Sequence, residues 1–175
     1  HSNSISSEEE DILNAQYNDH LEHFRKIMID GNIKLNKGVV LADFSGSMTG
    51  DPMNAAMAIA ILISDLCESP WNNRFISFES EPQWIQLTYP NTEIEYNKQQ
   101  CYTSDCFDST KAGQSLTFCE KVRVCASSPW GGSTNFMKAH ELILNIADEN
   151  NLTQEDMPEW FICASDMQFN HSQNT

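Results

Sequence analysis

Hydrophobic and polar positions along the first third of the chain change from a helical to a strand-like pattern. Apolar residues recur at helical spacing between Ala15 and Ile29, and the polar run Asp30-Gly31-Asn32 ends them. Gly38 to Ala42 is a short continuous apolar run, which is typical of a parallel strand covered on both faces. The pattern predicts a helix followed by a central strand, with residues 1–14 as a polar, flexible leader.

A second helix is expected after the strand. Met53 to Cys67 is apolar nearly all round, so we expect this helix to be buried on all sides. Asp51 is suited to the N-cap position and Pro52 to the first helical position.

The next segment predicts a hairpin and an insertion. Arg74 to Ser80 and Gln83 to Thr88 alternate apolar and polar residues, and only Glu81-Pro82 separates them. Their pattern favours an antiparallel strand at a sheet edge. Tyr89 to Gln114 is polar and too long for an ordinary connection, so we expect a surface insertion.

The last third of the chain repeats the helix and strand patterns. Leu116 to Ala126 is a helix candidate, and Phe136, Ala139, Ile143 and Ile146 mark another. Thr153 with Asp156 suggests a capped turn, and Trp160 to Ala164 reads as a buried strand. The alternation predicts an α/β fold, a Rossmann-like doubly wound and mostly parallel sheet with one antiparallel edge strand.

Three oxygen-bearing side chains follow the first strand at alternate positions. Asp43, Ser45 and Ser47 face the same way if the segment is extended, and Gly46 allows the loop to bend tightly. Carboxylate and hydroxyl oxygens suit Mg²⁺, and less strictly Mn²⁺ or Ca²⁺. Thr134 and Asp166 come from two other segments that reach the same sheet edge. We therefore predict one divalent-ion site built by these five residues.

This pattern resembles the metal-ion-dependent adhesion site (MIDAS) of von Willebrand factor A (vWA) domains. The wider likeness is to a plant and large-DNA-virus family of unknown function with a vWA-like domain, and more distantly to the vWA-like domain of the TROVE family. It covers about residues 15–170 apart from the insertion, and implies a vWA-like domain over residues 15–175 that binds Mg²⁺. The segments that carry the likeness are DFSGSMTGDPM, SPWNNRFISFESEP, WGGSTNF and EDMPEWFICASDMQF.

The resemblance also implies further helix and strand units after the third loop. This chain ends nine residues beyond Asp166, so we expect the C-terminal units of the fold to be missing from it.

Composition narrows the classes of partner. The chain has 175 residues, and its 25 acidic and 10 basic residues give a formal charge of -15, so direct nucleic-acid binding is not expected. No apolar run reaches the roughly 18 residues that span a bilayer, so no membrane contact is expected. A chain of this size does not need disulfides, which favours reduced thiols in an intracellular, cytoplasmic setting, or a host cell or virion if the protein is viral. Two sequons, at Asn151 and Asn170, leave a secreted origin open.

Other chemistry-bearing residues have simpler interpretations. Cys101, Cys106, Cys119 and Cys125 lack tight Cys-x-x-Cys pairs, so we expect no structural zinc. Cys67 and Cys163 read as core thiols, and His140 as solvated. The four tryptophans are expected to pack at element ends, and they are Trp71, Trp84, Trp130 and Trp160.

The sequence carries no enzyme signature that we recognise. There is no Gly-x-Ser-x-Gly elbow, no phosphate loop, and no base beside a nucleophile. We expect a noncatalytic, metal-dependent interaction module whose ion binds an Asp or Glu side chain of a partner protein. The alternatives are a protein-docking subunit of an RNA-associated particle, as in the TROVE family, and a metal-dependent phosphohydrolase.

Overall fold

The computed structural model describes residues 5–77, 81–98, 108–128 and 136–165 of the chain. It divides the protein into two compact units. Residues 35–86 with 128–175 form the sheet unit, and residues 1–34 with 87–127 form the helical unit. The expected organisation as a leader and one domain from residue 15 stays a prediction.

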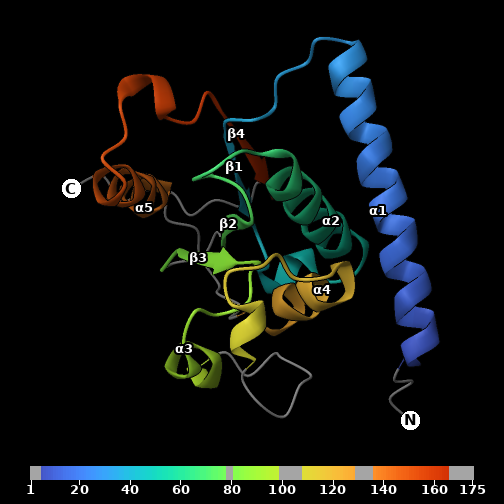
Figure 1. The fold of residues 1–175 in the computed structure, drawn as a ribbon. Coiled ribbons are helices and arrows are strands. Elements are labelled where there is room, and N and C mark those ends of the chain that lie inside the picture. The colour runs from blue at the N-terminus through green and yellow to red at the C-terminus, as the bar shows by residue number, and fades with distance from the viewer. Residues whose placement is uncertain (1–4, 78–80, 99–107, 129–135, 166–175) are drawn as a thin grey trace. The chain divides into compact units, whose positions relative to one another are not determined.

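The sheet unit is a mixed α/β structure around four strands, coloured from cyan to red in Figure 1. The strands are β1 (Gly38–Ala42), β2 (Arg74–Ser77), β3 (Gln83–Gln86) and β4 (Trp160–Ala164), in the order β3-β2-β1-β4. β1 is parallel to β2 and to β4, whereas β3 pairs antiparallel with β2 at one edge. The predicted mostly parallel sheet with one antiparallel edge strand is confirmed.

The helices of this unit are α2 (Asp51–Leu66) and α5 (Phe136–Glu149), which lie on opposite sides of the sheet (Figure 1). Two short 3₁₀ turns complete the unit, η1 (Gly46–Met48) and η3 (Gln154–Asp156). All five residues of β1 are buried, because helices cover both faces of the central strand.

Helix α2 differs from its prediction in two respects. Its N-cap is Gly50, at φ 94°, so Asp51 is the first helical residue instead of the cap. Complete burial was also wrong, because α2 packs one face on the sheet and leaves the opposite face exposed, with Ile59 at 38%. The exposed residues of that face include Asn54, Ala55 and Ala58.

Strand β4 has the predicted bounds but is not buried. Within the described residues it pairs with β1 alone, so it is an edge strand. Its exposure alternates, and Phe161 is 42% exposed. Cys163 is likewise exposed, so its assignment as a core thiol was wrong. The sequence pattern of five apolar residues does not reveal which strand lies at the edge of the sheet.

The helical unit begins with α1 (Ser7–Asp30), so residues 7–14 are helical and continuous with the helix expected from Ala15. Ser6 and Glu9 form a capping box in which each side chain binds the backbone N–H of the other residue. The hydrogen bonds that the Ser6 N–H and the Ser6 hydroxyl donate to the Glu9 carboxylate lower the pKa of Glu9. Three consecutive glutamates in the first turn, residues 8–10, also favour the helix N-terminus electrostatically.

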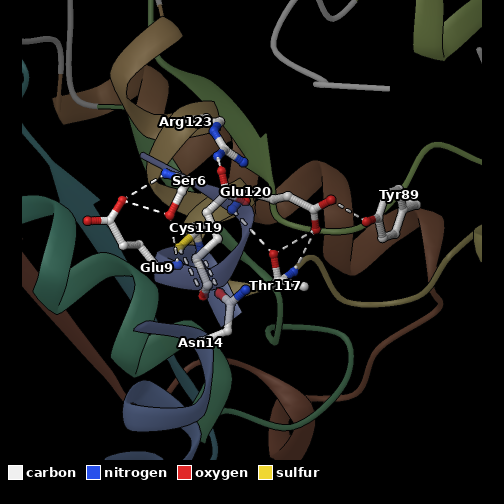
Figure 2. A network of polar contacts seen from close by, with 9 residues as sticks. Ser6, Glu9, Asn14, Tyr89, Thr117, Cys119, Glu120 and Arg123 are labelled. Atoms are coloured by element: carbon white, nitrogen blue, oxygen red, sulfur yellow. Dashed lines mark hydrogen bonds and ion pairs between the residues drawn. The ribbon is translucent and has the colours of Figure 1, made fainter. Parts of the chain in front are cut away.

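A polar network joins α1 to α4 (Phe118–Ser127) inside the helical unit, as Figure 2 shows. Asn14 accepts a hydrogen bond of 3.0 Å from the backbone N–H of Cys119, which satisfies a donor in the first turn of α4. Arg123 pairs with Glu10. The rings of Tyr17 and Phe118 stack with centroids 4.4 Å apart. Side chains therefore fix the crossing of these two helices.

The two ends of the predicted insertion pair with each other as a stem within the helical unit. Thr88 and Ser115 form an antiparallel bridge, and the Tyr89 N–H donates to the Gln114 carbonyl at 2.8 Å. The described parts between these residues include α3 (Glu93–Lys98) and the 3₁₀ turn η2 (Ser109–Lys111). The Tyr89 hydroxyl donates to Glu120 of α4 (Figure 2). The stem therefore holds the two ends of the insertion together.

In the described part of the chain, no helix combines the length and the apolar character needed to cross a membrane.

Candidate metal site at the carboxyl ends of two strands

The carboxyl ends of β1 and β4 place two polar residues side by side. The strands pair in register from Gly38 with Trp160 to Ala42 with Ala164. The Asp43 N–H then donates to the Ala164 carbonyl at 2.9 Å, which carries the ladder one step past β1. Asp43 is the first residue after β1 and Ser165 is the first residue after β4, so the two lie next to each other.

Asp43 is buried, with 2% of its surface exposed, and both carboxylate oxygens accept hydrogen bonds. The backbone N–H of Ser45 donates to Oδ1 at 2.8 Å, and the Ser165 hydroxyl donates to Oδ2 at 2.8 Å. Among the described residues no Lys, Arg or His forms an ion pair with Asp43. A buried carboxylate without a cation is costly, so its negative charge is available to compensate a bound ion.

The loop after β1 supplies a pair of hydroxyl groups. The hydroxyl oxygens of Ser45 and Ser47 lie 2.9 Å apart. Phe44 and Met48, which flank the two serines in the sequence, are buried and anchor the loop, and the Phe44 ring packs edge-on against Phe75. The alternation of apolar and hydroxyl residues thus places the serines on the outer side of the loop.

The bend that Gly46 was expected to allow does not require a glycine at this position. A Cβ at Gly46 would meet nothing within 4 Å, and its backbone has no positive φ. The loop is held instead by the Thr49 hydroxyl, which donates to the Gly46 carbonyl at 2.7 Å, and it turns at Gly50.

The donor set fits Mg²⁺ by its chemistry. The Ser45 and Ser47 hydroxyls form a hydrogen bond with each other at 2.9 Å. Hydroxyl and carboxylate oxygens are hard ligands. Within the described ranges no three His, Cys, Asp or Glu side chains group as metal ligands, so the candidate site rests on one carboxylate and on hydroxyls.

Of the five predicted ligands the structure describes Asp43, Ser45 and Ser47. The Ser45 N–H binds the Asp43 carboxylate and the Ser45 and Ser47 hydroxyls bind each other, and the convergence of these ligands on one ion stays a prediction. Thr134 and Asp166 lie outside the described residues. Ser165 is a site residue that the sequence analysis did not assign. Its only sequence signal is its position immediately after a strand that pairs with β1.

The remaining candidates have structural roles where they are described. Trp71 and Trp84 donate their indole N–H groups to the carbonyls of Asp156 and Leu142, which confirms that they pack within the unit. Trp160 covers Gly38, and Trp130 lies outside the described ranges.

His140 is not simply solvated, because its ring contacts Phe136 and Phe161 and its Nδ1 lies 2.8 Å from the Phe136 carbonyl. Its imidazole therefore packs at the surface between helix α5 and strand β4.

The cysteines considered for zinc separate into two groups. Cys119 and Cys125 are buried in α4, and burial is the main cause that raises the pKa of Cys119. Cys101 and Cys106 lie outside the described ranges. The absence of structural zinc therefore stays a prediction.

Comparison with known proteins gives one family and one viral relative. A family model described as a domain of unknown function, DUF7788, matches residues 37–106 and 96–175. An uncharacterized protein of Acanthamoeba polyphaga mimivirus is 31% identical over 135 residues, which cover 77% of this chain and 19% of that protein. The chain thus spans about a fifth of the length of that relative. No solved structure matches the chain.

Proposed function

This chain belongs to the family described as a domain of unknown function, DUF7788, and we propose that it is a noncatalytic, divalent-metal-dependent protein-interaction module. The observation that supports the proposal is the buried Asp43 carboxylate, which binds the backbone N–H of Ser45 in the same loop that carries the hydrogen-bonded Ser45 and Ser47 hydroxyls. The Asp-x-Ser-x-Ser spacing of these residues resembles the MIDAS of vWA domains.

In this proposal the residues of the site have different roles in binding Mg²⁺. The hydroxyls of Ser45 and Ser47 are neutral ligands, and Asp43 supplies negative charge from a fixed position. Thr134 and Asp166 complete the proposed set from the sequence pattern. With so few charged ligands, bound Mg²⁺ would keep an open position for a partner's Asp or Glu carboxylate.

The local chemistry favours binding over hydrolysis. A hydrolytic site needs a base that removes a proton from water. Both Asp43 oxygens already accept hydrogen bonds, and among the described residues its partners are a backbone N–H and a serine hydroxyl. Neither group is a base, so we propose that the site performs no reaction.

The proposed setting follows from charge and from the viral relative. A net charge of -15 repels nucleic acid and leaves a protein as the favoured partner. The mimivirus relative makes a host cell or a virion a reasonable setting for the interaction.

Metal titration is the first test. Calorimetric titration with MgCl₂ should give one binding event with wild type and none with Asp43→Ala. Glu141→Gln is the matched control, because it removes one exposed carboxylate from α5 and should leave binding unchanged. Equal binding by wild type and Asp43→Ala would exclude this site.

The second test asks what the site recruits. A partner captured in Mg²⁺ should be released by EDTA, should return with Mg²⁺, and should fail to bind Ser45→Ala. The captured material should contain protein with an essential acidic residue and little RNA. Metal-dependent hydrolysis of a phosphate ester that Asp43→Ala abolishes would instead identify an enzyme.

A further inference from the structure

We propose that Ser165 is a positioning residue that orients the Asp43 carboxylate for metal binding, an inference that rests on the proposed function above. Ser165 follows β4, and its hydroxyl donates to Asp43 Oδ2 at 2.8 Å across 122 residues of sequence. Ser165 is not among the five ligands that the sequence pattern predicts.

The carboxylate of Asp43 is held from two sides. The Ser45 N–H, in the loop that also presents the hydroxyl pair, binds Oδ1, whereas Ser165 binds Oδ2 from the neighbouring strand. Two donors on two different elements fix the rotation of a carboxylate, whereas one donor leaves it free to turn. The backbone donor is present in every variant, so Ser165 is the side chain on which this orientation depends.

Burial makes the hydroxyl hard to replace. Asp43 is 2% exposed, so a solvent water has little access to the oxygen that Ser165 binds. The adjacent backbone is also constrained, because the Asp43 N–H donates to the Ala164 carbonyl. Loss of the hydroxyl would therefore leave a buried carboxylate oxygen without its donor and free to reorient.

The test compares Mg²⁺ affinity with stability. MgCl₂ titration by calorimetry, with Mn²⁺ binding by electron paramagnetic resonance as a second readout, should show about tenfold weaker binding for Ser165→Ala. Ser165→Thr keeps the hydroxyl and should restore most of the affinity. If Ser165→Ala does not fold, Ser165→Cys provides the same comparison with a weaker donor.

Thr153→Ala is the matched control. Its hydroxyl also donates to a carboxylate, that of Asp156 at 2.7 Å, but Thr153 precedes η3 near the amino end of β4. This variant should lose stability and keep the wild-type affinity for Mg²⁺.

Three results would overturn the inference in different ways. A lower melting temperature of Ser165→Ala in EDTA with unchanged Mg²⁺ affinity would make Ser165 merely structural, and the proposed function would stand. Equal weakening by Thr153→Ala would show that the effect is not local to the site. Absence of Mg²⁺ and Mn²⁺ binding by wild type would overturn the proposed function itself.

Discussion

The two ends of the β1–β4 strand pair share one register but are built from opposite kinds of contact. At the amino end the Trp160 ring lies against Gly38, so closely that a Cβ at Gly38 would come within 2.1 Å of it. The Cys67 thiol donates to the Gly38 carbonyl there at 3.4 Å. At the carboxyl end Asp43 is buried with hydrogen-bond donors and no described cation.

This contrast separates an end of the strand pair that stabilises the fold from an end that costs stability. Close apolar packing contributes directly to folding, whereas a buried carboxylate without a cation costs free energy. Residues that cost stability concentrate where binding requires them. The amino end therefore secures the strand pair, and the carboxyl end presents the candidate site.

The largest expected effect comes from filling the space at the amino end. Gly38→Ala should lower the free energy of unfolding by about 3 kcal/mol, because the new methyl group overlaps the Trp160 ring. Urea unfolding measures this change. Gly46→Ala is the matched control at the other end, where the methyl group meets nothing within 4 Å, and it should be nearly neutral.

The double variant Gly38→Ala with Trp160→Val should recover part of the lost stability, because the smaller side chain leaves room for the methyl group. Full stability of Gly38→Ala alone would show that this end is loosely packed.

A smaller effect should appear as a pH dependence from Cys67. Burial, the main cause, raises the pKa of this thiol from 9.0 to about 11 in the folded protein. The unfolded thiol loses its proton first, so the stabilising contribution is complete below pH 9 and is lost as the pH rises through about 11.

Wild type should therefore lose stability between about pH 8 and pH 10 more steeply than Cys67→Ser, which has no such ionisation in this range. Urea unfolding at both pH values checks this. Parallel losses in the two proteins would assign the dependence to other groups.

The smallest expected change is at Asp43, in EDTA. Asp43→Asn removes the buried charge but keeps an oxygen for the Ser45 N–H, so the free energy of unfolding should stay within about 1 kcal/mol of wild type. The same variant should lose the rise in melting temperature that Mg²⁺ causes. A loss comparable to that of Gly38→Ala would mean that the carboxylate is part of the structural framework.

Local sequence patterns predicted the positions of the strands well because each pattern reports backbone preference directly, although the pattern of β4 did not report its exposure. β1 and β4 have the predicted bounds, and the β2–β3 hairpin lies where the alternation of Arg74 to Thr88 placed it. The first half of α1 was missed although Ser6 and Glu9 carry a capping-box signature. The polar composition of residues 1–14 predicted a flexible leader instead. A capped helix, however, needs few apolar residues in its first turns.

The candidate site was less predictable because it depends on how strands pair. Alternation within one segment placed Asp43, Ser45 and Ser47 together, since their spacing is local. Ser165 contacts Asp43 only through the β1–β4 register, which a single sequence does not contain. The exposure of Cys163 was missed for the same reason, since it depends on which strands cover β4.

The paired stem at Thr88 and Ser115 makes the segment between them an exchangeable cassette. The backbone bonds of the stem hold its two ends together. The entropic cost of closing a longer flexible loop grows only with the logarithm of its length, by about 0.6 kcal/mol for each doubling. Evolution can therefore lengthen, shorten or replace this segment at little cost to the helices on which the stem stands. Insertions, deletions and substitutions between relatives should therefore be most frequent between Thr88 and Ser115. The same segment is the best place to graft a foreign peptide.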